Sequence, residues 1–256
     1  MRDENLGNAM KIIRIQLTIV LALLALFGAR AASSQESNFT TGTLDGVHLK
    51  IAREYQFFPV AYEGVDIWQP ASSDESHVKT GVFASFSLRL QFPDFTPFKE
   101  DKLGSVGVYP SSENQDRWMT VHVGHRPTVG QVSERAWLRN YVARLKEYHW
   151  SSNGVIWTYR RDGMAFGLMR EVMVGPDFSV IDFRNKALYF DAELPTVYIT
   201  CLNGAVAKDG VKECTENFLM PGTFWFVQVT FNDRHLSEWK AIKEHVIDRI
   251  DSFIVH

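Results

Sequence analysis

The spacing of apolar residues along the chain predicts a series of β-strands. The clearest strand runs from Val82 to Phe92, where apolar residues alternate with Ser, Arg and Gln. Such alternation is typical of a strand with one buried face and one face open to water. Shorter stretches of the same kind predict strands at 47–51, 119–124, 155–159, 164–169, 179–183, 186–190, 197–202 and 223–231.

One local signal predicts a hairpin in the middle of the chain. Arg161-Asp162-Gly163 lies between the predicted strands 155–159 and 164–169. Asp-Gly is a strong short-range signal for a two-residue turn. We therefore expect the chain to reverse direction at Asp162-Gly163.

Two segments have helical spacing. Apolar residues recur at intervals of three and four between 132 and 148, with Ser133 as the N-cap. The end of the chain has a longer apolar stripe, which Asn232 or Asp233 can cap. We expect this stripe to lie across a sheet. Its members are Leu236, Trp239, Ile242, Val246, Ile250 and Phe253.

The order of these elements indicates an α+β fold, with an antiparallel sheet packed against amphipathic helices. We expect a single domain over 46–256. Strands are followed by a helix twice, in 46–150 and in 151–256. This order is compatible with two duplicated halves, although no residue-level repeat supports a duplication. The Ser-, Thr- and Asn-rich stretch 33–45 is predicted to be a flexible linker.

The beginning of the chain predicts export. Lys11 and Arg14 precede an apolar run of about 11 residues, Leu17–Phe27, and Ala29-Arg30-Ala31 follows as an A-x-A cleavage pattern. The run is shorter than the roughly 20 residues of a spanning helix. We therefore expect residues 1–32 to be a cleaved signal peptide, with an uncleaved anchor as the alternative. No cysteine follows the run, which excludes lipid attachment at a lipobox.

The charge balance argues against some partners. The chain has 27 basic and 30 acidic residues. Removal of 1–32 takes four basic and two acidic residues, which leaves 23 and 28, a net charge of −5. Nucleic acids and anionic membrane surfaces select basic faces, so neither is an expected partner. After signal cleavage we expect no stable membrane anchor.

The two cysteines, Cys201 and Cys214, lie in the exported part of the chain. In an oxidising compartment they are expected to form a disulfide. Free thiols remain an alternative. A metal site needs more ligands than two sulfurs, and the sequence has no C-x-x-C motif or nearby histidine cluster to supply them.

No motif in the sequence specifies catalysis. G-x-S-x-G, H-E-x-x-H and Walker patterns are missing from it. His122 and His125 are three residues apart on a predicted strand end, so their side chains point to opposite faces and cannot share a metal without a turn. We interpret the carboxylates of Glu63, Asp66, Asp74 and Glu75 as a solvated acidic loop, with an acid/base pair as the alternative. We expect no enzyme activity, cofactor or metal.

The segment 62–68 is the candidate interface. It places Tyr62 and Trp68 beside Glu63 and Asp66 within a long connection, 53–79. Aromatic anchors next to charged groups are typical of protein-binding hot spots. In the alternative interpretation, Phe57, Phe58, Ile67 and Trp68 fold into the core and the carboxylates face water.

Two stretches resemble a known family. The first holds Val47-His48-Leu49-Lys50-Ile51, Phe57-Phe58-Pro59-Val60, Tyr62-Glu63-Gly64 and Asp66-Ile67-Trp68, and the second holds Phe231, Leu236, Trp239, Ile242, Val246 and Ser252-Phe253. Together these stretches resemble periplasmic immunity proteins of type VI secretion toxin–immunity pairs, in particular the lipase-immunity group. The resemblance covers about a quarter of the chain. Many such relatives are lipoproteins, from which this sequence departs because it has no lipobox cysteine.

The resemblance implies a function by binding alone. The protein would neutralise a cognate secreted toxin, a lipase or phospholipase, in the periplasm, and a peptidoglycan-degrading toxin is equally compatible. The aromatic-rich sheet also allows a periplasmic module that binds a lipid or another apolar ligand. A third alternative is an envelope hydrolase whose site is scattered along the sequence.

Overall fold

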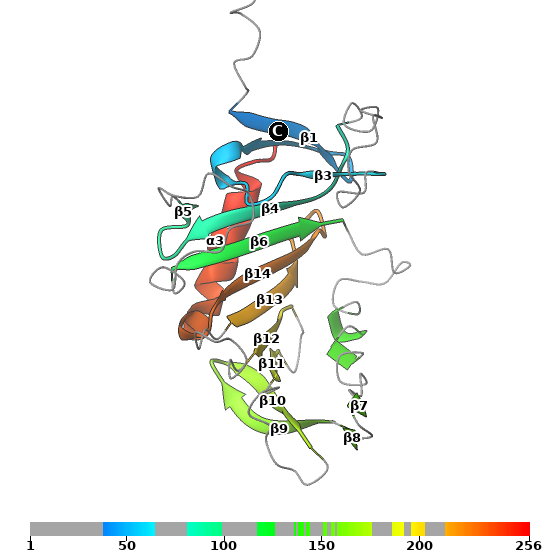
Figure 1. Ribbon diagram of the computed structural model, residues 1–256, viewed down its shortest axis with the longest axis vertical. Coiled ribbons are helices and arrows are strands. Elements are labelled where there is room, and N and C mark those ends of the chain that lie inside the picture. The colour runs from blue at the N-terminus through cyan, green and yellow to red at the C-terminus, as the bar shows by residue number, and fades with distance from the viewer. Residues whose placement is uncertain are drawn as a thin grey trace, which may run out of the picture. The chain divides into compact units, whose positions relative to one another are not determined.

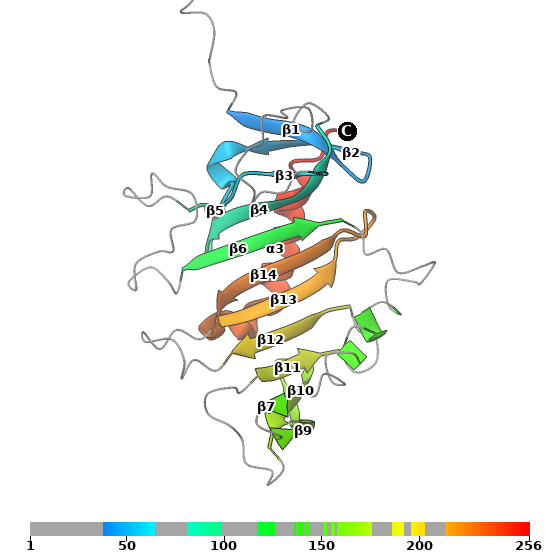
Figure 2. The ribbon, with the colours of Figure 1, turned by 45° about the vertical axis from the view of Figure 1, so that its right-hand side comes forward.

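The computed structural model shows an antiparallel sheet with one long helix on one of its faces (Figures 1 and 2). It describes residues 38–64, 81–98, 117–125, 158–175, 186–191, 196–202 and 213–256, together with positions within 136–143 and 151–156. The predicted signal peptide, the strand at 179–183, Asp66 and Trp68 lie outside these ranges. Residues 39–256 form one compact unit.

Ten strands of the described chain form the main sheet, in the order β3-β4-β6-β14-β13-β12-β11-β10-β9, with β5 paired to β4. All its pairings are antiparallel, which confirms the α+β class. Strand β14 lies between β6 and β13, so the two passages 46–150 and 151–256 share one sheet. The strands are β3 (Ala61–Tyr62), β4 (Phe83–Gln91), β5 (Thr96–Pro97), β6 (Trp118–Gly124), β9 (Thr158–Ala165), β10 (Leu168–Val174), β11 (Lys186–Phe190), β12 (Tyr198–Leu202), β13 (Glu213–Leu219) and β14 (Phe226–Asn232).

A separate hairpin begins the compact unit and corrects one prediction. β1 (Phe39–Leu44) pairs with β2 (Val47–Ala52), and a short 3-10 helix, η1 (Arg53–Tyr55), follows. The predicted flexible linker 33–45 is therefore wrong over 39–44. Positive φ angles at Asp45 (49°) and Gly46 (82°) are those of a type I′ turn, the turn that suits a two-residue hairpin. Another small pair joins β7 (Ser151–Ser152) to β8 (Val155–Ile156).

Gly42 allows β1 to lie close to β4. A Cβ atom at position 42 would collide with the ring of Phe83 and with the carbonyl oxygen of Gly81, both beside the start of β4. Gly42→Ala is expected to destabilise the protein by about 1–3 kcal/mol, because the overpacked hairpin must move. Urea unfolding measures the change. Gly124→Ala, where the new methyl group meets only an ordinary contact with His122, is the control, and equal losses for both variants would contradict the prediction.

The second hairpin turns at a different position from the predicted one. β9 continues through Asp162-Gly163, and the chain reverses at Phe166-Gly167, where φ is 55° and 78°. Arg170 lies opposite Gly163 and Glu171 lies opposite Arg161, so Asp162 is the extra residue of a β-bulge. Its carboxylate pairs with Arg170. The Asp-Gly step therefore bends a strand instead of ending it.

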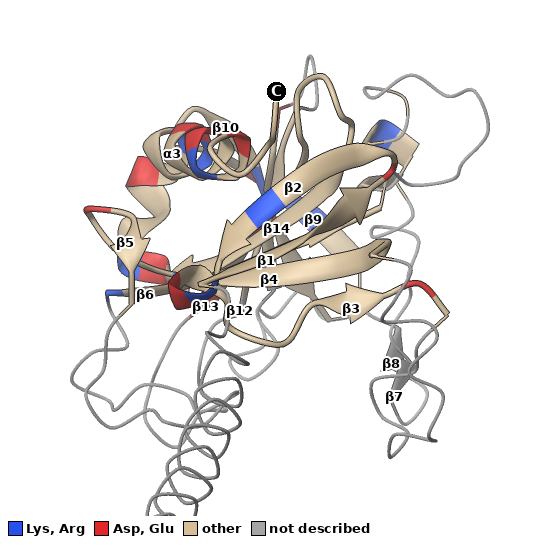
Figure 3. Cartoon of the chain, turned by 90° about the horizontal axis from the view of Figure 1, so that it is seen from above, with Lys and Arg blue, Asp and Glu red and all other residues tan. Residues whose placement is uncertain are grey.

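The C-terminal helix confirms the predicted stripe. A 3-10 helix, η3 (Asp233–Glu238), leads into α3 (Trp239–Asp251), and Asn232 Oδ1 accepts a hydrogen bond from the Arg234 N–H at 3.1 Å. All six members of the stripe are buried. Figure 3 shows acidic and basic positions along the same helix. This division of residues is that of a helix with one face on a core and the other in water.

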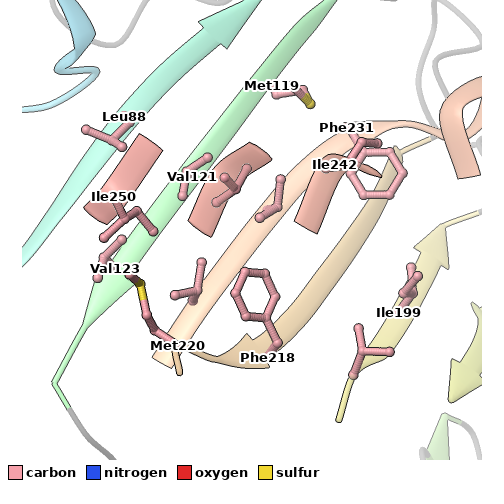
Figure 4. Close-up of a cluster of buried hydrophobic side chains, with 14 of the residues drawn as sticks. Leu88, Met119, Val121, Val123, Ile199, Phe218, Met220, Phe231, Ile242 and Ile250 are labelled. Atoms are coloured by element: carbon pink, nitrogen blue, oxygen red, sulfur yellow. The ribbon is translucent and has the colours of Figure 1, made fainter. Parts of the chain in front are cut away.

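The main core lies between α3 and the sheet (Figure 4). Val121, Phe218, Ile242 and Ile250 are fully buried there. Cys201 and Cys214 also belong to this core, and they lie directly opposite each other on β12 and β13. They form a disulfide, which confirms the predicted pairing.

A second helix covers part of the other side of the sheet. The described positions of the predicted helix 132–148 are helical, from 136 to 143. Leu138 and Val142 are buried against Leu188 of β11 and Tyr198 of β12. Their spacing of four residues places both side chains on one helix face.

Candidate functional site: an aromatic cleft on the open sheet face

The sheet face opposite α3 carries a polar surface over β4, β6, β14 and β13, which we call the open face. Its side chains follow from the alternation of each strand, since every second residue points away from the core. The strand register aligns them in two rows across the sheet. One row is Ser87, His122, Gln228 and Asn217, and the other is Arg89, Thr120, Thr230 and Thr215.

Hydrogen bonds between neighbouring strands hold these side chains in place. Gln228 Nε2 donates to Asn217 Oδ1 at 2.8 Å, and Asn217 Nδ2 donates to the backbone oxygen of Thr215 at 3.0 Å. The hydroxyl oxygens of Thr215 and Thr230 are 3.3 Å apart. Polar groups that are already paired form an ordered surface, and a partner would meet it with little loss of side-chain entropy.

A cleft of about 330 Å³ opens on this face. One wall is aromatic, and we call Phe57, Phe58 and Trp118 the aromatic wall. The Phe57 ring centroid is 4.2 Å from that of Phe58 and 5.6 Å from that of Trp118. The described residues that line the cleft are Phe57, Phe58, Ser87, Trp118, Thr120, Val121, His122, Glu213 and Thr230.

Buried packing and a backbone hydrogen bond hold the aromatic wall in place. Phe57, Phe98 and Trp118 are buried together, and the backbone N–H of Phe57 donates to the carbonyl of Ser87 at 2.9 Å. The Arg89 guanidinium lies 5.5 Å from the ring centroids of Phe57 and Phe98. Phe58 differs from its neighbours because 43% of its surface is exposed. It is therefore an apolar anchor on a rigid support.

His122 forms part of the cleft floor and is hydrogen-bonded to Ser87, with 3.1 Å between Nδ1 and Oγ. Burial lowers the pKa of His122, which keeps the ring neutral near neutral pH. Among the described residues no carboxylate bonds to His122, so this pair lacks the third member of a Ser-His-Asp arrangement. The described residues also contain no group of three or more His, Cys, Asp or Glu side chains that could hold a metal.

Two of the four predicted interface residues lie in the described chain, and neither lines the cleft. The ring of Tyr62 packs 5.5 Å from that of Phe83 and against the main core. His125 Nε2 lies 3.3 Å from Glu63 Oε1, and His125 Nδ1 lies 2.8 Å from Asp45 Oδ1. Asp66 and Trp68 fall outside the described ranges. The interface role thus stays a prediction for Tyr62, Glu63, Asp66 and Trp68.

The cleft joins residues that are distant in the sequence. Phe57 and Phe58 had a local signal, as part of Phe57-Phe58-Pro59-Val60 beside the predicted interface. Trp118, Thr230 and Glu213 meet only because β14 lies between β6 and β13. The rings of His122 and His125 have different partners, which are Ser87 and Asp45.

In the described part of the chain, no helix combines the length and the apolar character that a membrane crossing requires.

Comparison with known proteins identifies a fold and no sequence family. No family model matches the chain, and no curated protein matches it. The arrangement of sheet and helix is shared with a solved immunity protein. That structure is Smlt3025, an immunity protein of the Stenotrophomonas maltophilia type IV secretion system, with a TM-score of 0.53 and 12% identity. The match covers 86% of this chain and 94% of that one.

A second solved structure, the iron-regulated outer membrane lipoprotein FrpD of Neisseria meningitidis, matches with a TM-score of 0.37 and 10% identity. This match covers 85% of this chain and 93% of that one.

Proposed function

We propose that this protein is an immunity protein, which binds a secreted antibacterial toxin and neutralises it by occupying its surface. One observation carries the proposal: the fold is shared, over 86% of the chain, with a solved immunity protein. The resemblance of the segments 47–68 and 231–253 to periplasmic immunity proteins supports the same role. A protein of this kind needs a stable surface and no chemistry of its own.

The cleft on the open face is the proposed contact surface. An exposed aromatic residue on an ordered polar surface is the usual composition of an interface hot spot. Phe58 offers apolar area to a partner, while Thr120, Thr230 and Ser87 offer hydrogen-bonding groups beside it. The interface predicted for Tyr62, Glu63, Asp66 and Trp68 is a second proposed contact, in addition to the cleft.

Compartment and toxin type are finer parts of the proposal. Residues 1–32 have the pattern of a signal peptide, and the neutralising step is therefore proposed for the periplasm. The sequence resemblance implies a type VI phospholipase as the toxin, whereas the solved neighbour belongs to a type IV system. We propose the phospholipase as the first toxin to test.

The test uses the secreted toxin encoded next to this gene. Co-expression with an affinity tag on the toxin is expected to yield a stable complex. Cells that direct the toxin to their periplasm should survive only if this protein is also exported, and phospholipid release should stop in the complex. A toxin that shows no binding at micromolar concentration, and that kills cells regardless, would overturn the proposal.

Phe58→Ala is expected to weaken toxin binding about tenfold, because truncation of an exposed aromatic anchor lowers the binding free energy by about 1–2 kcal/mol. Phe39→Ala supplies the control, since Phe39 is similarly exposed, at 39%, but lies on β1. Surface plasmon resonance measures both dissociation constants. If Phe39→Ala weakens binding as much as Phe58→Ala does, the cleft is not the contact surface.

A second candidate function is favoured by the volume of the cleft. About 330 Å³ lies at the small end of pockets that hold small molecules. A lipid or another apolar ligand would contact the aromatic wall but would also cover polar groups of the floor, such as Thr120 and His122, which is unfavourable. Native mass spectrometry of protein from its own host should show a retained small molecule if this function holds.

A further inference from the structure

The lining of the cleft has a defined charge. Glu213 is the one carboxylate among the described lining residues, and it forms no ion pair within the described chain. His122, the other ionisable group of the lining, is neutral near neutral pH because burial lowers its pKa. Arg89 is not among the described lining residues, and its guanidinium lies 5.5 Å from the ring centroids of Phe57 and Phe98. Among the described lining residues, Glu213 thus carries the one negative charge.

The carboxylate and the aromatic wall lie on opposite sides of the cleft. Glu213 begins β13 and is paired with Asn232 of β14, and β14 separates it from Trp118 at the start of β6. Neighbouring strands are about 4.8 Å apart, so roughly 10 Å of sheet separates the backbones of Glu213 and Trp118. That span accommodates the end of one long side chain between ring and carboxylate.

We propose that the cleft receives a basic side chain, lysine or arginine, that the partner protein projects onto the open face. The inference rests on the proposed function, which it deepens by naming the chemistry of the partner at this contact. Aromatic ring faces attract cations, and the Glu213 carboxylate supplies the opposite charge. The position of Arg89 over Phe57 shows that rings of this cluster already accept a guanidinium.

Other occupants fit the cleft less well. An apolar side chain would cover Thr120, Thr230 and His122 without hydrogen bonds, and each unsatisfied polar group opposes binding. An acidic side chain would meet Glu213, a like charge. An alkyl chain with a cationic end satisfies both sides, because its stem lies against the rings and its N–H groups can donate to the floor and the carboxylate.

A small probe tests the cleft without any toxin. We expect n-butylguanidinium to cause saturable NMR shifts at the indole N–H of Trp118 and at the amides of Thr120 and Thr230. Butyrate has a similar alkyl chain with the opposite charge, and it should cause no saturable shift there. Equal shifts with both probes, or none with n-butylguanidinium, would overturn the inference.

Two variants identify the groups that bind the cation. Glu213→Gln should weaken n-butylguanidinium binding about threefold or more, as expected for loss of one partly screened charge pair. Phe58→Ala should weaken it about two- to fivefold, the range of an accessible cation–π contact. Glu244→Gln removes an exposed carboxylate from α3 and is the matched control, for which binding should not change. Equal binding to wild type and Glu213→Gln would exclude the proposed role of Glu213.

The toxin complex separates this inference from the proposed function. If the toxin binds wild type, Glu213→Gln and Glu244→Gln equally well, the protein is still an immunity protein, and the inference about the basic side chain is wrong. Binding that falls only for Glu213→Gln, and that weakens as salt is added, supports both. If no toxin binds, the proposed function is overturned, while the n-butylguanidinium titration still reports on the chemistry of the cleft.

Discussion

Above about pH 8, Glu216→Gln is expected to be more stable than wild type. Between about pH 5 and pH 8, the stability of wild type should decrease as pH rises, and the variant should lack most of this decrease. Glu216 lies on β13 in the core beneath α3, between Val229 and Ile199 on the neighbouring strands. Both of its carboxylate oxygens are buried without a hydrogen-bond partner in the described chain. A carboxylate in this position opposes folding when it is charged.

The direction of the effect follows from the pKa of Glu216. Burial raises the pKa from 4.5 to about 8, and the nearby Lys243 charge offsets this only in part. Lys243 Nζ donates instead to the backbone oxygen of Thr196, at 3.3 Å. Between the two pKa values the folded chain holds a proton that the unfolded chain has lost. The free energy of unfolding therefore falls as pH rises through this window, by up to roughly 5 kcal/mol.

Urea unfolding at several pH values tests this prediction, with the difference between wild type and Glu216→Gln as the measured quantity. That difference isolates Glu216, because His122 and Asp251 titrate in both proteins. Glu213→Gln is the matched control, since it removes a carboxylate from the same strand but from the open face. Parallel stability profiles for wild type and Glu216→Gln would show that Glu216 does not titrate in this window.

Glu216 also explains why the sequence pattern did not predict β13, a central strand of the sheet. β13 carries Glu216 on its core face and Asn217 on its open face, and both are buried. Their polarity hides the alternation that identified β4, where Phe86, Leu88 and Leu90 recur without interruption. A hydrophobicity pattern cannot predict that a polar residue is buried when its burial depends on pairing with neighbouring strands on both sides.

Local signals were reliable where tertiary pairing agreed with them. The apolar stripe at the end of the chain was predicted completely, because one face of η3 and α3 meets the core from Leu236 to Phe253. The turn at Asp162-Gly163 was wrong because the sheet favours another register. A turn at Phe166-Gly167 lets Leu168 face the core, and the Phe166 carbonyl accepts a hydrogen bond from Trp239 Nε1 at 3.0 Å.

The candidate site could be predicted only in part, for a related reason. The sequence pointed to the neighbourhood of Phe58, because aromatic residues gather there. The rest of the cleft depends on strand order, and no local pattern places Glu213 beside Thr230 or Trp118. A surface that is assembled across a sheet requires the register before its residues can be named.

Replacement of both Cys201 and Cys214 by alanine is expected to lower the free energy of unfolding by about 3 kcal/mol, with a range of roughly 2–5. The bridge joins β12 to β13 and closes a segment with a sequence separation of 13. Without it, the unfolded chain gains the freedom that the closed segment had lost. The double variant avoids the free buried thiol that a single substitution would leave.

Because the Cys201–Cys214 disulfide is buried, we expect it to resist reduction in the native protein. Cys201 is 4% exposed and Cys214 is fully buried in the core against α3, so a reductant reaches the sulfurs only after the structure opens. Mild reductant should leave the native protein unchanged, whereas reductant in urea should lower the unfolding midpoint to that of the double variant. Thiol labelling and urea unfolding measure the two steps. Rapid labelling of the native protein, or a double variant as stable as wild type, would contradict a bridge that acts by constraining the unfolded chain.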